Sequence, residues 1–121
     1  MKAAFFALAA LALPFTAHAA KDSYLCPQVK PQFGPADKVM ILTRLSHGAI
    51  PDGMDVRYAL QVTMNGEVRL AELAIAKQNP AEVAFKVRGK QVAGFIPLEK
   101  EGESTLKIGR QAYRFICRVK N

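Results

Sequence analysis

The feature that most constrains the fold of this chain is a series of short segments in which apolar and polar residues alternate. The clearest spans residues 56–64, where every second side chain is apolar, and this period of two predicts a strand with one buried face. Asn65-Gly66 follows at once and readily adopts the positive φ values of a tight hairpin turn. Two further hairpins are predicted, one turning at Arg88-Gly89-Lys90 and one at Gly109-Arg110.

Short turns between consecutive strands favour a mainly β fold, an antiparallel meander that closes as a sandwich or barrel of about six or seven strands. Residues 39–45 are apolar on both faces and predict another buried strand, whereas the prolines and glycine of residues 27–37 predict an irregular lead-in. Residues 67–78 allow two interpretations. The preceding turn favours a return strand, but an apolar stripe beneath an Asn65 cap would also suit a helix, and the class would then be α+β.

The N-terminus has the pattern of a secretory signal. Lys2 precedes an unbroken apolar run over residues 3–13 that is too short to span a bilayer, and Ala17-His18-Ala19 supplies the small residues that a signal peptidase accepts. We therefore expect residues 1–19 to be a signal peptide. Residues 20–121 are expected to form a single periplasmic or secreted domain without a stable membrane span.

The chain contains two cysteines, Cys26 and Cys117. In an oxidising compartment they are expected to pair, and the disulfide would then close almost the whole domain. The chain-entropy model gives a loop of that length a stabilisation of roughly 4 to 5 kcal/mol as an upper figure. A reactive or metal-binding thiol pair is not indicated, because the sequence has no C-x-x-C spacing and no histidine beside either cysteine.

The last hairpin is predicted to carry a cationic stripe, in a chain with 17 Lys and Arg against 10 Asp and Glu. Phe115, Cys117 and Val119 share one side of the predicted strand, and if Cys117 is buried this side faces the core. Arg114, Arg118 and Lys120 then face outward, and a two-residue turn places Lys107 on the same outer face. No acidic residue follows Glu103, so nothing on the hairpin itself neutralises these charges. A solvated strand whose charges prevent edge pairing remains the alternative to a binding surface. The candidate partner-binding residues of the stripe are Lys107, Arg110, Arg114, Arg118 and Lys120.

Residues 46–55 are predicted to form the longest loop, because they contain two glycines and a proline, and loops of this kind often carry function. His47, Asp52 and Asp55 are further candidate partner-binding residues there. His47 is the only histidine left after cleavage, which excludes a two-histidine zinc or copper site on one chain. The two aspartates lack the spacing of an EF-hand calcium loop. No metal and no cofactor is therefore expected.

Catalysis is not expected either. Ser46-His47 is the only neighbouring nucleophile and base after cleavage, and adjacent residues on a strand point apart. The sequence has no phosphate-binding loop and no nucleic-acid-binding signature. The expected function is a secreted binding module for an envelope protein or anionic polymer, for example an inhibitor or immunity-type protein. The alternative is a periplasmic metal-handling or stress-related carrier, suggested by His47, Met54 and the two aspartates in one loop.

Tyr24-Leu25-Cys26 followed by a late Cys117 is similar to the arrangement in small periplasmic lysozyme inhibitors. That resemblance would imply an inhibitory loop with a Ser-Gly motif, and this chain contains no Ser-Gly dipeptide. The two shared features cover little of the chain, and the sequence does not assign it to that family.

Overall fold

The structure is a computed structural model that describes residues 23–99 and 102–120, so the expected signal peptide and its cleavage site lie outside the described residues. Every regular element in this part of the chain is a β-strand, and none is a helix that could cross a membrane. The strands are β1 (Ser23–Pro27), β2 (Lys38–Arg44), β3 (Asp55–Met64), β4 (Glu67–Lys77), β5 (Glu82–Val87), β6 (Val92–Pro97), β7 (Ser104–Ile108), β8 (Gln111–Phe115) and β9 (Arg118–Lys120).

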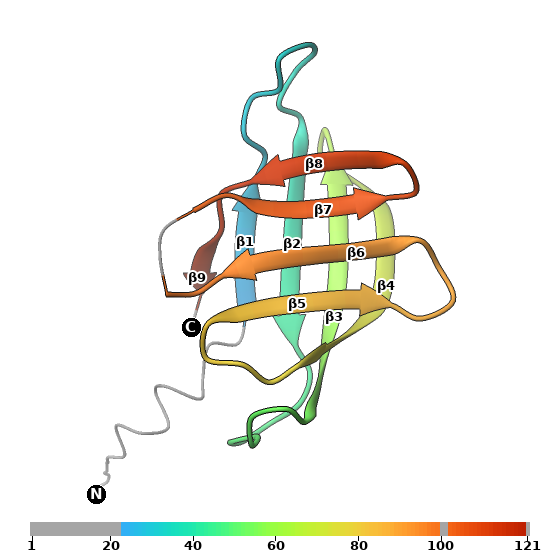
Figure 1. Ribbon diagram of the computed structural model, residues 1–121. Coiled ribbons are helices and arrows are strands. Elements are labelled where there is room, and N and C mark those ends of the chain that lie inside the picture. Colours follow the sequence, from blue (N-terminus) through green and yellow to red (C-terminus); the bar gives the residue numbers. More distant parts are fainter. Residues whose placement is uncertain (1–22, 100–101, 121) are drawn as a thin grey trace, which may run out of the picture.

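The strands form one antiparallel meander in the order β8-β7-β6-β5-β4-β3-β2-β1-β9. Figure 1 shows that they make two layers, with β5 to β8 crossing over β1 to β4. The two layers are joined at a narrow corner, where only Ile75 and Ala76 of β4 pair with Lys86 and Phe85 of β5. The predicted mainly β meander is confirmed, and its layers enclose a nearly closed barrel.

The barrel closes on its other side because β8 and β9 lie along the remaining edge of β1. Leu25 pairs with Arg118 of β9, and Gln28 bridges to Phe115 of β8. Both pairs fit a single antiparallel register, which continues across the gap between β8 and β9. In that gap the Ile116 N–H donates to the Pro27 carbonyl at 3.0 Å. Proline has no N–H to return the bond, which accounts for the interruption at this point. β8 and β9 therefore act as one interrupted strand, the eighth of the barrel.

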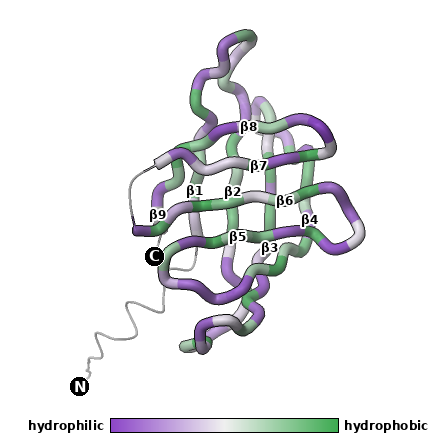
Figure 2. The backbone as a smooth tube through the Cα atoms, in the orientation of Figure 1, coloured by the Kyte–Doolittle hydropathy of each residue, from purple (hydrophilic) through white to green (hydrophobic). Residues whose placement is uncertain are grey.

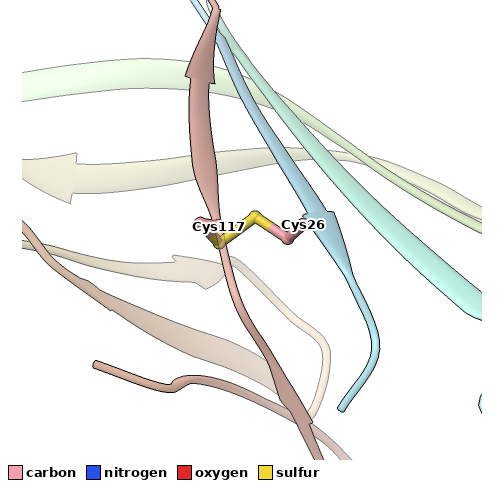
Figure 3. The surroundings of a disulfide bond; sticks show 2 residues. All are labelled: Cys26 and Cys117. Atoms are coloured by element: carbon pink, nitrogen blue, oxygen red, sulfur yellow. A yellow bond between two sulfur atoms is a disulfide. The ribbon is translucent and has the colours of Figure 1, made fainter. Parts of the chain in front are cut away.

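The predicted disulfide is present between Cys26 and Cys117, whose Cα atoms lie 3.9 Å apart (Figure 3). The two cysteines are 91 residues apart in sequence. The register that pairs Leu25 with Arg118 also places them directly opposite each other. Because the next pair along exchanges a backbone hydrogen bond, the cysteine pair occupies the narrow position where facing strands come closest. The disulfide thus links the first and last strands at the closure of the barrel.

The core consists of side chains at alternate positions on the strands of both layers. Figure 2 shows hydrophobic residues recurring along these strands, while the tips of the β5–β6 and β7–β8 hairpins are mostly hydrophilic. This is the pattern that a period of two produces when one strand face is buried. The buried apolar residues are Tyr24, Cys26, Met40, Leu42, Val56, Tyr58, Leu60, Val62, Ala74, Ala76, Val83, Phe85, Val87, Val92, Ile96, Leu106 and Phe115.

One glycine in the core is required by packing. Gly94 of β6 pairs with Phe85 of β5, and the Phe85 ring lies directly over it. A Cβ atom at position 94 would stand 2.2 Å from Phe85 Cζ, which is much closer than van der Waals contact. Gly94 therefore provides the space in which the largest side chain of β5 is buried.

The predicted turns are confirmed. Asn65 and Gly66 have φ of 53° and 82°, and Gly89 and Gly109 also have positive φ. Residues 67–77 form a strand, so the preferred interpretation holds and the helical alternative is wrong. The hairpin turn pairs Glu67 with Met64 and thereby begins the return strand. Within this strand, Leu70, Ala74 and Ala76 face the core.

Two sequence predictions need correction. The described part of the chain forms a barrel of eight strands, with β9 as a continuation of β8, and the additional strand is Ser23–Pro27, which the sequence did not predict. Its proline and the proline-rich segment after it obscured a five-residue strand. The loop between β2 and β3 is also not uniquely long, because the connection between β1 and β2 contains as many residues.

Candidate functional site

The tips of two hairpins lie side by side and bring several basic residues together. The Gly109 N–H, in the β7–β8 turn, donates to the Gln91 carbonyl, in the β5–β6 turn, at 2.7 Å. Figure 1 shows both tips on the same side of the molecule, near β4. We call the cationic residues of these tips and of the strand ends beside them the hairpin-tip cluster. Its members are Lys86, Arg88, Lys90, Lys107 and Arg110.

The strands direct two of these lysines outward. Lys86 and Lys107 are exposed, and each lies between residues of its own strand that are buried or partly buried against the core. Lys86 pairs with Ala93, Ala93 pairs with Lys107, and Lys107 pairs with Ala112. Small alanine side chains therefore separate the two lysines across the sheet, and no acidic residue stands in this row.

Most of the hairpin-tip cluster has no acidic partner. Lys86, Arg88, Lys107 and Arg110 form no ion pair with any residue in the described ranges, whereas Lys90 pairs with Glu72 of β4. Arg88 is also close enough to Asp55 to contribute to lowering the pKa of that carboxyl. Like charges held together in this way raise the local positive potential, which an anionic partner would relieve.

The structure divides the predicted cationic stripe. Lys107 lies opposite Ala112 as expected, and Arg110 lies in the adjoining turn. Arg114 is exposed on the same strand, but its Nη1 lies 3.0 Å from Glu103 Oε1, so the expectation of an unneutralised stripe is wrong there. Glu103 comes directly before β7 and reaches across the hairpin to Arg114.

Arg118 and Lys120 belong to the other layer of the barrel. Both lie on β9, which pairs with β1 rather than with β7, so Arg118 sits beside Leu25. The side chain of Lys120 lies outside the described part of the structure. The interruption at Pro27 and the crossing of the layers separate these residues from Lys107 and Arg110, so one continuous stripe does not form.

The other predicted site residues lie in the connection between β2 and β3, residues 45–54, and at its end. His47 and Asp52 are exposed, while Ile50 packs against the core. The end of the loop is held by the Gly53 N–H, which donates to the Gln78 carbonyl at 2.8 Å. Asp55, the first residue of β3, interacts electrostatically with Arg88 of the hairpin-tip cluster.

Asp55 forms an ion pair with Lys77. Its Oδ1 lies 2.6 Å from Lys77 Nζ, and the hydrogen bond and charge of Lys77 lower the pKa of the carboxyl. Within residues 23–99 and 102–120, no group of three or more His, Cys, Asp or Glu side chains comes together in a way that could hold a metal ion.

Sequence reasoning missed a pocket of about 410 Å³ beside the connection between β1 and β2. The pocket lies between that loop and β8, and Phe33 of the loop is 84% exposed. Two basic residues line it, Lys38 and Arg114. Lys38 Nζ lies 3.2 Å from Asp37 Oδ1 and 4.8 Å from the centre of the Tyr113 ring, and Arg114 pairs with Glu103. Both charges are already engaged, so the pocket has less to offer an anion than the hairpin-tip cluster.

A pair of tyrosines occupies the core of β1 and β3. Burial raises the pKa of Tyr24 to about 12, the neighbouring Tyr58 adds to the rise, and Arg44 opposes it. Burial raises the pKa of Tyr58 as well. Both phenols are therefore neutral in the folded protein at ordinary pH.

Three members of the hairpin-tip cluster were also missed: Lys90, which lies in the β5–β6 turn, and the pair Lys86 and Arg88. The alternation of Val83, Phe85 and Val87 was a signal that could have placed both outward. Their proximity to Lys107 and Arg110 could not be inferred in the same way, because it depends on how the two hairpins pair. Comparison of the chain with protein-family models, with curated proteins and with solved structures found no match.

Proposed function

We propose that this chain is an exported, non-catalytic binding module that recognises an anionic protein or polymer of the cell envelope through the hairpin-tip cluster. The observation that carries the proposal is the convergence of Lys86, Arg88, Lys107 and Arg110, none of which forms an ion pair with another described residue. Clusters of this kind contribute mainly to association rate and to discrimination between partners.

The rest of the molecule supports this proposal by supplying a rigid platform. The hairpins that carry the cluster belong to a closed meander fastened by the Cys26–Cys117 disulfide. A disulfide fits an oxidising compartment, and the signal pattern of residues 1–19 supports export to the periplasm or beyond. A secreted inhibitor or immunity-type protein needs a surface of this kind, held in place before it meets its partner.

The proposal is tested by reversing charges within the cluster and away from it. Arg88→Glu with Arg110→Glu alters the cluster, and Lys30→Glu with Arg118→Glu makes the same change in net charge at exposed positions elsewhere. Binding of each purified protein to immobilised poly-L-glutamate is measured at several salt concentrations. The cluster variant should bind at least about tenfold more weakly, and wild-type affinity should fall as salt rises.

Thermal unfolding of both double variants shows whether they remain folded. If the two variants lose affinity equally, the wild-type protein responds only to net charge and the cluster is no specific site. If the cluster variant folds and binds as the wild type does, the proposal is wrong.

A further inference from the structure

Most of β4 has no strand of the described part of the chain beside it on the side away from β3. β3 pairs with β4 along its whole length, from Asp55 with Lys77 to Met64 with Glu67. On the opposite side, pairing with β5 is confined to Ile75 and Ala76. Within the described part of the chain, residues 67–74 therefore form an open edge at the corner between the two layers.

The hydrogen-bond pattern identifies the backbone groups that this edge exposes. The Gln78 N–H donates to the Met54 carbonyl at 2.7 Å. This bond shows which residue pairs of β3 and β4 are the hydrogen-bonded ones. Bonded pairs alternate in an antiparallel ladder, so even-numbered residues of β4 up to the bulge bond to β3. Ala71 and Leu73 then direct their N–H and C=O groups away from β3. Both residues are exposed, Leu73 at 49%.

Other features of β4 restrict the usable edge. The register shifts where Val62 is followed by Thr63, and this leaves an extra residue, Arg69, in β4. Arg69 also pairs with Glu67 at 3.0 Å. Bulges and charges discourage strand pairing, so the open edge is limited to residues 70–74. It has room for a short extended segment of about five residues.

The hairpin-tip cluster lies beside this edge. Glu72 is at an inward-facing position of β4, between outward-facing Ala71 and Leu73, and its carboxylate pairs with Lys90 at the β5–β6 tip. An inward-facing acidic side chain on a strand added beside β4 would likewise approach Arg88 and Arg110. Outward-facing side chains of that strand would lie next to Ala71 and Leu73, where apolar residues fit.

We infer that residues 70–74 of β4 bind an extended segment of an acidic partner protein by strand addition, the segment alternating acidic and apolar side chains. The inference rests on the proposed function and narrows its partner from any anionic molecule to a protein segment. Charge favours this occupant over a second copy of the chain, because pairing two β4 edges would bring two cationic clusters together.

The test uses a capped peptide of about eight residues that alternates glutamate and valine. Two analogues of this peptide carry N-methyl groups on every second residue. One analogue is methylated at the odd-numbered residues and the other at the even-numbered residues. A strand added to one edge directs only one set of its N–H groups toward β4. One analogue should therefore bind like the parent peptide, and the other should bind about tenfold more weakly because it loses two or more hydrogen bonds.

Amide hydrogen exchange locates the binding. Addition of the parent peptide should slow exchange at Ala71 and Leu73 and leave Ala74, already bonded to β3, unchanged. If the two analogues bind with equal affinity, or lose affinity equally, strand addition is wrong. If peptide binding is nevertheless weakened by Arg88→Glu with Arg110→Glu, the proposed function still stands. Absence of binding by the peptide and by poly-L-glutamate overturns both. Slower exchange at Ala71 and Leu73 when the free protein is concentrated would identify a second copy as the occupant and overturn the inference.

Discussion

Cys26 and Cys117 face each other across the pair of strands that closes the barrel, at a position where the strands exchange no backbone hydrogen bonds. The neighbouring position holds Pro27, which cannot donate to β8–β9. Backbone pairing is therefore weakest where the disulfide lies. The covalent bond compensates for a hydrogen bond that the closing strand lacks.

Replacing both cysteines by serine should lower the free energy of unfolding by about 2 to 5 kcal/mol, because the disulfide restricts nearly the whole unfolded chain. Urea unfolding of the variant and of the wild-type protein measures this difference. An intact-mass measurement should show no free thiol in the exported wild-type protein. Two free thiols there, or equal stability of the two proteins, would contradict the closing role of the disulfide.

Gly94→Ala should destabilise the barrel by about 1 to 3 kcal/mol, because its methyl group would overlap the Phe85 ring. Gly102→Ala is the matched control, since a Cβ there meets only a side-chain atom of Pro97 at 3.5 Å. Repeating Gly94→Ala in a Phe85→Ala background separates the contact from general effects on β6. In the Phe85→Ala background, Gly94→Ala should lower the free energy of unfolding very little. An undiminished loss of stability would show that overlap with the Phe85 ring is not its cause.

The buried phenols predict a loss of stability at alkaline pH. The pKa of Tyr24 is raised from 10.0 to about 12, so between these values the unfolded chain releases a proton that the folded protein retains. The contribution of the neutral Tyr24 phenol to stability is fully present below pH 10 and is lost as the pH rises toward 12. The free energy of unfolding should fall by up to about 2 kcal/mol over this range. Tyr24→Phe should show a shallower decline in urea midpoint over this range. Parallel pH profiles for the two proteins would contradict the prediction.

Local patterns were sufficient to predict the hairpins. Alternation predicted the strand at residues 56–64, Asn65-Gly66 predicted its turn, and the register of Lys107 with Ala112 followed from a two-residue turn. The disulfide followed from the signal pattern and the number of cysteines. Each of these features depends on residues that are close in sequence or on a single possible pairing.

The arrangement of the hairpins could not be predicted in the same way. β4 pairs with β5 at only two positions, so the layers cross, and this crossing places Arg118 away from Lys107. The cluster of Lys86 and Arg88 with Arg110 depends on pairing between hairpins that alternation does not specify. The ion pair between Arg114 and Glu103 could not be predicted either, because it forms across the hairpin and depends on the register of β7 and β8.

The most direct test of the central claim is chemical-shift mapping of the isotope-labelled wild-type protein during titration with soluble poly-L-glutamate. The account predicts that the largest amide shifts fall on residues 86–91 and 107–111, the two hairpin tips and the strand ends beside them, and that added salt reverses them. Shifts confined to residues 45–54, or to residues 28–38 around the pocket, would contradict the claim that the hairpin-tip cluster is the binding surface.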